Sequence, residues 1–138
     1  IPTGEIASVE GTPMDFRTEK QIGQDIRADF EQLHFTGGYD HNYVLGRSGE
    51  KKIMANAYCR ESGIALEAAT DCCGVQFYAG NFIGEQTGKG GAAYHDRSAF
   101  CLESQFYPNA VNEPDFPSPV VKAGDTYHTE TSYRFYLR

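Results

Sequence analysis

Short runs in which apolar and polar residues alternate, separated by glycine and proline, constrain this chain of 138 residues more than any other feature. In the run GIALEAAT (63–70), Leu66 and Ala68 lie on one side and Glu67 on the other. Alternation with a period of two is typical of a β-strand with one buried face. The same pattern recurs in 51–60, 74–80 and 132–138. These strands favour an antiparallel β-sandwich or barrel.

The segment RESG (60–63) separates two of these runs and predicts a hairpin turn. The run before it, KKIMANAYCR, places Ile53, Ala55 and Ala57 on one face. Two other stretches predict loops. The glycine-rich segment 84–97 lacks the spacing of a phosphate-binding loop, and the proline-rich segment 108–119 predicts an extended path over the surface.

One short helix is expected in TEKQIGQDIRADF (18–30). Thr18 and Gln21 have the spacing of a capping box, and three apolar residues follow at intervals of four: Ile22, Ile26 and Phe30. Gly23 weakens the helix by about 1 kcal/mol relative to alanine, so we expect it to be short.

Composition excludes several classes of function. The net charge of -7 and the pI near 5.0 disfavour binding to nucleic acid or to an anionic membrane surface. No apolar stretch is long enough to span a bilayer. The cysteines form no zinc or disulfide pattern, and the adjacent pair is expected to be two buried thiols rather than a redox pair: Cys59, Cys72, Cys73 and Cys101. We therefore expect a cytoplasmic protein with reduced thiols and no metal.

Three polar residues interrupt strand-like or aromatic sequence. Glu103 lies within SAFCLESQFY (98–107), which predicts one continuous strand and a buried carboxylate. Gln76 interrupts GVQFY, and Asp40 follows a double glycine. Each also has a structural interpretation. Asp40 could cap a turn, Gln76 could face outward from a half-buried strand, and Glu103 could pair with an arginine across the sheet.

Together these residues fit a carbohydrate site better. Carboxylates and amides bind sugar hydroxyls through paired acceptors and donors, and aromatic rings cover the apolar faces of sugars. The chain supplies nine tyrosines and nine phenylalanines. Spacing alone does not show that the three polar residues converge.

A set of longer motifs points to one family. In chain order they are IPTGEI (1–6), GTPMDFR (11–17), GYDHNYVL (38–45), GVQFYAGNFI (74–83), LESQ (102–105) and FPSPVVKAGDTYHTETSYRF (116–135). With these motifs, residues 1–138 resemble the C-terminal portion of the galactose mutarotase (aldose 1-epimerase) family. The resemblance implies an all-β fold, an antiparallel β-sandwich of the galactose mutarotase-like type, of which this chain would form one part.

The resemblance also implies an activity. Family members interconvert the α and β anomers of free aldohexoses such as galactose and glucose. By this resemblance Glu103 is the catalytic base, while Asp40 and Gln76 bind sugar hydroxyls. The family needs no cofactor and no metal.

The acid of the family is a histidine in an N-terminal half that has no counterpart in this chain, and His41 is expected to have a structural role. We therefore expect the N-terminal half or a second chain to complete the sandwich. Two alternatives stay open. One is a non-catalytic carbohydrate-binding module or inactive fragment. The other is a glycosidase that uses Asp40 and Glu103 as its two carboxylates.

Overall fold

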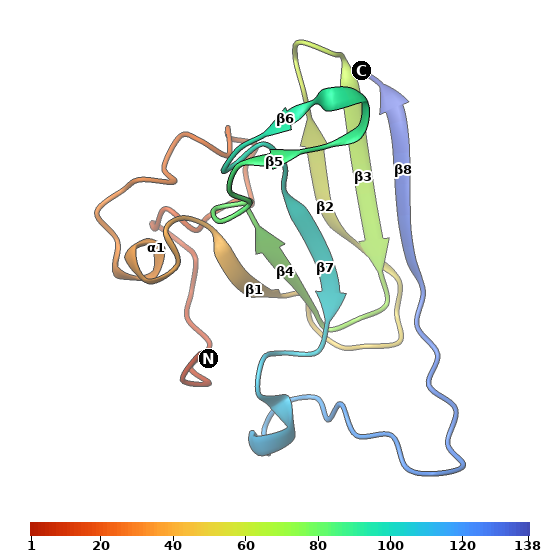
Figure 1. The fold of residues 1–138 in the computed structure, drawn as a ribbon. Helices are drawn as coiled ribbons and strands as arrows, with labels where there is room; N and C mark the ends of the chain where they lie inside the picture. Colours follow the sequence, from red (N-terminus) through yellow and green to blue (C-terminus); the bar gives the residue numbers. More distant parts are fainter. The chain divides into compact units, whose positions relative to one another are not determined.

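The structure, a computed structural model, describes all residues from 1 to 138 (Figure 1). Its strands form three sheets, in the orders β1-β4-β7, β2-β3-β8 and β5-β6. The elements in chain order are α1 (Glu31–Thr36), β1 (Asp40–Val44), β2 (Lys52–Tyr58), β3 (Ile64–Thr70), β4 (Gly74–Tyr78), β5 (Gln86–Thr87), the 3-10 helix η1 (Lys89–Gly91), β6 (Ala93–Tyr94), β7 (Cys101–Gln105), the 3-10 helix η2 (Ala110–Asn112) and β8 (Thr131–Leu137). Strands therefore dominate and helix is scarce, which confirms the predicted all-β class. None of the helices has the length and apolar character needed to cross a membrane.

The chain forms two compact units. Unit 1 contains residues 1–4, 42–76 and 102–138, and unit 2 contains residues 5–41 and 77–101. The sheet β2-β3-β8 lies wholly in unit 1, together with the parts of β1, β4 and β7 that fall in these ranges. The hairpin β5-β6 and the helix α1 lie in unit 2.

The predicted hairpin turn at 60–63 is confirmed. Strands β2 and β3 pair antiparallel on either side of it, and the Cys59 N–H donates to the Ile64 carbonyl at 2.9 Å. Gly63 adopts a φ of 69°, which a residue without a Cβ adopts at little cost. Strand β8 then pairs antiparallel with β3.

The prediction that Ile53 shares a face with Ala55 and Ala57 is wrong. The pairing of β2 with β3 shifts between Ile53 and Ala55, so Met54 is an extra residue in β2. A bulge of this kind breaks the alternation of side chains along a strand. Ile53 is 57% exposed as a result.

In β4 the predicted alternation is confirmed. Val75 and Phe77 are 3% and 8% exposed, while Gln76 and Tyr78 are only half-buried. The expectation that Cys72 and Cys73 are ordinary thiols also agrees with the structure, in which both are free and buried. Cys73 Sγ donates to the Gln105 carbonyl at 3.7 Å.

The helix predicted over 18–30 is wrong. This segment contains isolated turns, such as the bond from the Gln24 N–H to the Gln21 carbonyl, and the only α-helix begins at Glu31. Gly23 disfavours helix, and side chains of the segment make other contacts. Lys20 Nζ donates to the Asp25 carboxylate at 2.9 Å, and Ile26 is buried at 6% exposure.

The strand predicted over 98–107 is shorter than expected, and the prediction of a buried carboxylate is wrong. Strand β7 runs only from Cys101 to Gln105, and Glu103 is exposed. The residues before the strand form a turn, in which the Ser98 N–H donates to the His95 carbonyl at 3.0 Å. Phe100 is consequently 37% exposed.

Both predicted loops contain regular structure. The segment 84–97 includes the short hairpin β5-β6, and 108–119 includes the 3-10 helix η2. The second segment is not purely extended, because Asn109 turns the chain with a φ of 60°. The ring of Tyr107 then packs edge-on against Phe116 at 5.1 Å.

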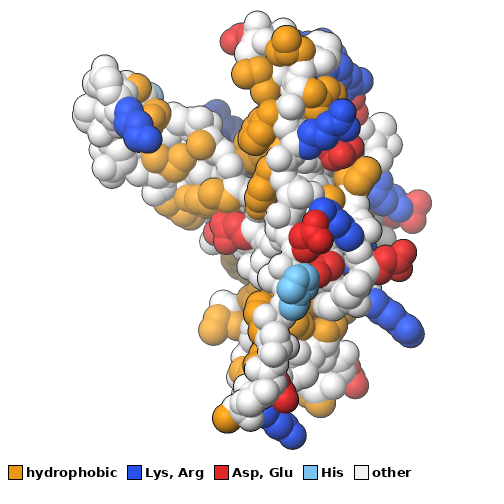
Figure 2. Space-filling model, turned by 90° about the vertical axis from the view of Figure 1, so that its right-hand side faces the viewer, with side chains coloured by type: hydrophobic (Ala, Val, Ile, Leu, Met, Phe, Trp, Pro, Cys, Tyr) orange, Lys and Arg blue, Asp and Glu red, His pale blue; other side chains and the backbone are white.

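One face of the sheet β2-β3-β8 carries exposed apolar side chains. Leu137 pairs with Ile64, and Phe135 pairs with Leu66, so these four side chains share a face. Phe135 and Leu137 are 69% and 82% exposed. Figure 2 shows hydrophobic side chains reaching the surface on the side of the molecule where β8 lies. Contiguous exposed apolar surface of this kind is typical of an interface.

Candidate functional site

Gln76 and Glu103 lie in unit 1, on the neighbouring strands β4 and β7. Gln76 is half-buried at the middle of β4, and Glu103 is exposed at the middle of β7. The ion pairs of the structure all involve other residues, so the alternative in which Glu103 pairs with an arginine has no support.

Contacts in unit 1 show that these two side chains share a face of the sheet. Gln105 Nε2 donates to Asn42 Oδ1 at 3.3 Å. A Cβ at Gly74 would lie 2.6 Å from the same Asn42 oxygen. Positions 105 and 74 therefore face Asn42 together. Because side chains alternate along a strand, Glu103 lies on the same face as Gln105, and Gln76 lies on the same face as position 74.

Strand β8 bonds to the residues on either side of Glu103, to the backbone of Leu102 and to the side chain of Ser104. Tyr133 Oη donates to the Leu102 carbonyl at 2.8 Å, and the hydroxyls of Ser104 and Thr131 lie 2.7 Å apart. Thr131 Oγ1 also lies 3.0 Å from the hydroxyl of Thr70 in β3. These bonds hold the strand on both sides of Glu103, whose side chain is exposed.

Asp40 lies in unit 2, where it begins strand β1 after the glycine pair Gly37–Gly38. Its side chain is half-buried. The helix α1 ends at this glycine pair. Gly37 has a φ of 65°, and the Gly38 N–H donates to the Leu33 carbonyl at 3.0 Å, which is the pattern of a Schellman cap. Asp40 is therefore the first residue of the strand that follows this cap.

His41 accepts a hydrogen bond from the backbone next to Asp40. The Asp40 N–H donates to His41 Nδ1 at 3.1 Å, which requires a ring nitrogen without a proton. Burial lowers the pKa of His41 below its ordinary value of 6.5, although the Asp40 carboxylate and a backbone hydrogen bond with Gln32 oppose this shift. The neutral form that accepts the Asp40 N–H is therefore favoured.

Tyr39, the residue before Asp40, is fully buried in an aromatic cluster. Its ring lies 4.9 Å from Phe16 and 5.5 Å from Phe77, and burial raises its pKa to about 12. Tyr39 Oη donates to the Pro13 carbonyl at 3.0 Å. The cluster fixes the start of β1 against the core of unit 2.

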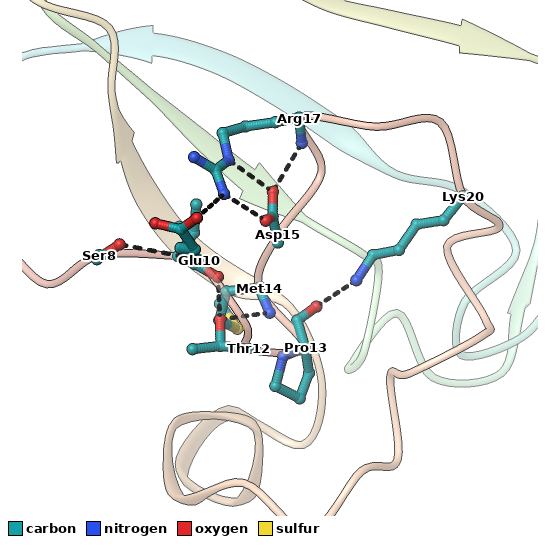
Figure 3. Close-up of polar contacts among 9 residues, drawn as sticks. Ser8, Glu10, Thr12, Pro13, Met14, Asp15, Arg17 and Lys20 are labelled. Atoms are coloured by element: carbon teal, nitrogen blue, oxygen red, sulfur yellow. Dashed lines mark hydrogen bonds and ion pairs between the residues drawn. The ribbon is translucent and has the colours of Figure 1, made fainter.

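Pro13 belongs to the segment shown in Figure 3. Its carbonyl also accepts a hydrogen bond from Lys20 Nζ at 2.6 Å. Two residues further on, the Asp15 carboxylate accepts bonds from Arg17 Nε and Nη2 at 3.0 and 2.8 Å. These bonds lower the pKa of Asp15 to about 2. The segment is thus tied to itself and, through Pro13, to Tyr39.

Two residues at this site did not emerge from the sequence. Asn81 Nδ2 donates to the carbonyls of Thr36 and Tyr39 at 3.1 and 3.0 Å. Arg97 Nη2 donates to the Gly37 carbonyl at 2.6 Å. The only sequence signal for Asn81 is a polar residue three positions after the end of strand β4, and Arg97 carries none.

No group of three or more histidine, cysteine, aspartate or glutamate side chains could hold a metal ion. The candidate residues carry carboxylate groups, on Asp40 and Glu103, and an amide group, on Gln76. Such groups can exchange hydrogen bonds with the hydroxyls of a small polar molecule, and a carboxylate can also accept a proton.

Comparison with known proteins defines the class. Residues 1–134 match the family model described as "Aldose 1-epimerase". A GalM/aldose epimerase homologue from C. elegans, known from a crystal structure, superimposes with a TM-score of 0.78 at 31% identity, covering 99% of this chain and 40% of that chain. This neighbour confirms the expected β-sandwich type. The chain belongs to the aldose 1-epimerase family.

Two curated relatives are similar to this chain in sequence. Galactose mutarotase of Bos taurus is 45% identical over 136 residues, or 98% of this chain and 38% of the relative. Aldose 1-epimerase of Escherichia coli is 36% identical, over 98% of this chain and 40% of the relative. The chain thus spans about two fifths of the length of these relatives.

Proposed function

We propose that this protein is an aldose 1-epimerase that interconverts the α and β anomers of free aldohexoses such as galactose and glucose. Membership of the family is the observation that carries the proposal. The proposal is supported in unit 1 by the common face that Gln76 and Glu103 share. It is supported in unit 2 by the rigid backbone that presents Asp40.

In this proposal Glu103 is the general base. Its carboxylate removes the proton from the anomeric hydroxyl while an acid protonates the ring oxygen. The C1–O5 bond breaks as the C1–O1 double bond forms. The open-chain aldehyde rotates about C1–C2, and the ring closes on the other face with the proton transfers reversed. A positioned base contributes roughly 10²- to 10⁴-fold to the rate.

The remaining roles concern binding. Asp40 and Gln76 each bind a sugar hydroxyl, the carboxylate as an acceptor and the amide as both donor and acceptor. The acid is assigned to a histidine outside residues 1–138, since His41 already holds the Asp40 N–H. The reaction requires no cofactor and no metal, because both proton transfers use side chains.

Polarimetry of the complete gene product tests the catalytic role. Pure α-galactose should reach its equilibrium rotation faster with the enzyme than without it. Glu103→Gln keeps the size of the side chain but removes its basicity, so it should lower kcat by roughly 10²- to 10⁴-fold and leave binding of galactose largely intact.

The matched control is Glu61→Gln, a substitution at an exposed carboxylate in the β2–β3 turn. It should leave kcat unchanged. If the complete wild-type product binds galactose but does not accelerate its mutarotation, the proposed activity is wrong and a carbohydrate-binding module is favoured. Cleavage of an aryl glycoside would instead identify a glycosidase.

We also propose that the exposed apolar face of β2-β3-β8 is covered in the working protein, by another segment of the same protein or by a second chain. This face leaves three large apolar side chains in water, those of Phe135, Leu137 and Ile64. Contiguous apolar surface of this kind usually marks an interface in a soluble protein. Residues 1–138 alone should bind a hydrophobic dye such as ANS strongly, and the complete gene product should not. Equal dye binding by both would contradict this.

A further inference from the structure

Asn81 is buried, at 5% exposure, yet only one end of its amide has partners. Nδ2 donates two hydrogen bonds, while Oδ1 is buried without a partner. Because both partners of Nδ2 are carbonyl oxygens, the amide cannot be turned around. A buried oxygen without a partner is unfavourable, so a requirement other than stability is expected to keep this amide here.

The bonds of Asn81 converge on the peptide that leads into Asp40. The carbonyl of Tyr39 and the N–H of Asp40 belong to one planar peptide unit. The oxygen of this unit accepts bonds from Asn81 Nδ2 at 3.0 Å and from the Ala79 N–H at 2.9 Å. Its N–H donates to His41 Nδ1 at 3.1 Å. Both ends of the plane are held, so its rotation is restrained.

The preceding peptides are held in the same way. The Thr36 carbonyl accepts from Asn81, and the Gly37 carbonyl accepts from Arg97 at 2.6 Å. The Gly38 carbonyl accepts from Thr36 Oγ1 at 2.6 Å. Every carbonyl from position 36 to position 39 therefore has a donor, and Asn81 supplies a donor to the first and the last of them.

Gly38 makes room for this arrangement. Its φ of 141° is disfavoured for residues with a side chain, and a Cβ would lie 2.3 Å from Asn81 Oδ1. The amide oxygen thus occupies the space where a side chain at position 38 would begin. The absence of a side chain at 38 and the amide at 81 are geometrically matched.

Arg97 supports the same turn from an unusual backbone conformation. It has a φ of 66°, which is uncommon for a residue other than glycine. Its own N–H donates to the Gly80 carbonyl at 2.7 Å, next to Asn81 in the chain. The guanidinium is exposed, so its bond to Gly37 competes with water and is weaker than the buried bonds of Asn81.

We propose that Asn81 is a positioning residue, which holds the Tyr39–Asp40 peptide so that the Asp40 carboxylate is presented to the sugar, with Arg97 as a weaker second support. This inference rests on the proposed role of Asp40 in sugar binding. Asn81 itself does not touch the sugar. Its effect on activity passes through Asp40.

A double-mutant cycle on the complete gene product tests this assignment, with KM and kcat for α-galactose measured by polarimetry. Asn81→Asp keeps the shape of the side chain but replaces the NH₂ donor with an oxygen. It should raise KM about tenfold, because small displacements of a binding group are costly. In the background of Asp40→Ala, the same substitution should change KM by less than about twofold, because coupled residues do not act additively.

A second measurement does not depend on activity. Hydrogen exchange at the Asp40 amide should be faster in Asn81→Asp and, to a smaller extent, in Arg97→Gln. Because Arg97 is exposed, Arg97→Gln is expected to fold even if Asn81→Asp does not. The control is Asn112→Asp, at an exposed asparagine that bonds only to Asn109. It should change neither KM nor the exchange rate.

The outcomes separate this inference from the proposed function. If Asp40→Ala lowers activity but Asn81→Asp and Asp40→Ala have independent effects that multiply, Asn81 has only a structural role and the inference is overturned. If Asp40→Ala leaves KM and kcat unchanged, the sugar-binding role of Asp40 is wrong, and the inference is overturned with it. Unchanged exchange at the Asp40 amide in both Asn81→Asp and Arg97→Gln would also overturn it.

Discussion

The backbone before Asp40 and the strand around Glu103 are both held by hydrogen bonds from other elements, but these bonds differ in burial and in the type of donor. Before Asp40, the main donor is the buried amide of Asn81, which serves two carbonyls. Around Glu103, the bonds come from the hydroxyls of Thr131 and Tyr133 in β8, which are less buried.

The difference indicates how each region tolerates change. A buried polar group whose partner is removed costs more than an exposed one, because water cannot replace the lost bond. The turn before Asp40 should therefore be sensitive to single substitutions. The strand that carries Glu103 should lose less from any one of them, because β8 holds it at two separate points. Four substitutions or titrations test this comparison.

The largest effect is expected for Gly38→Ala. Its Cβ would lie 2.3 Å from Asn81 Oδ1 and 3.1 Å from Ile26 Cγ1, at a φ of 141° that already disfavours alanine. We expect a loss of about 3 kcal/mol or more in the free energy of unfolding, measured by urea denaturation.

Gly46→Ala is the control, because its φ is 105° and a Cβ there meets no atom within 4 Å. It should cost about 1–2 kcal/mol. Equal losses would show that Asn81 does not restrict position 38.

A smaller effect is expected at the support of Glu103. Thr131→Val keeps the shape of the side chain but removes the hydroxyl shared by Ser104 and the buried Thr70. We expect a loss of about 1–2 kcal/mol in the free energy of unfolding. Thr131→Ser retains the hydroxyl and should recover most of it. If Thr131→Val costs as much as Gly38→Ala, the two regions do not differ as proposed.

These regions also differ in how far the sequence could predict them. Alternation predicted β4 and the strands on either side of the 60–63 turn, because the period of a strand is a local property. It failed at Ile53, where a bulge shifts the register, and at Glu103, where the chain leaves Phe100 and the carboxylate exposed. Only three-dimensional contacts decide those features.

Long-range hydrogen bonds to the backbone were the least predictable part. Asn81 bonds to carbonyls 42 and 45 residues away, and Arg97 to one 60 residues away. A carbonyl is present at every residue, so no residue type marks it as a partner. The helix expected over 18–30 failed for a related reason, since Ile26 is buried next to Gly38, twelve residues away.

A titration tests His41, which accepts the hydrogen bond of the Asp40 N–H and so also holds the Tyr39–Asp40 peptide. The pKa of His41 lies below its ordinary value of 6.5 because burial disfavours the charged form. The unfolded chain then binds a proton at a pH where the folded chain does not, so the free energy of unfolding falls as the pH drops below 6.5 and is constant above it. Protonation also removes the acceptor for the Asp40 N–H.

Urea denaturation at several pH values between 5.5 and 8 measures this dependence. His41→Gln should abolish most of the fall, whereas a variant at an exposed histidine, His128→Gln, should retain it. The Asp40 amide should also exchange faster at pH 5.5 than the intrinsic effect of pH predicts. If the free energy of unfolding depends on pH in the same way in wild type and in His41→Gln, protonation of His41 does not destabilise this turn.

The smallest effect is expected for Asp15→Asn, because Asp15 makes no direct contact with the peptides before Asp40. Asp15 accepts two bonds from Arg17, and the segment reaches Asp40 only through Pro13 and Tyr39.

The Arg17 bonds lower the pKa of Asp15 from 3.8 to about 2, so the carboxylate contributes stability above pH 3.8 and loses it as the pH falls towards 2. Both side chains are accessible to solvent, so salt should screen the pair. We expect a small difference between wild type and Asp15→Asn in the urea midpoint at pH 7, which shrinks in about 1 M NaCl and is lost as the pH falls through about 2. Exchange at the Asp40 amide should not change. Faster exchange there would show that this exposed pair, and not only the buried amide of Asn81, controls the position of Asp40.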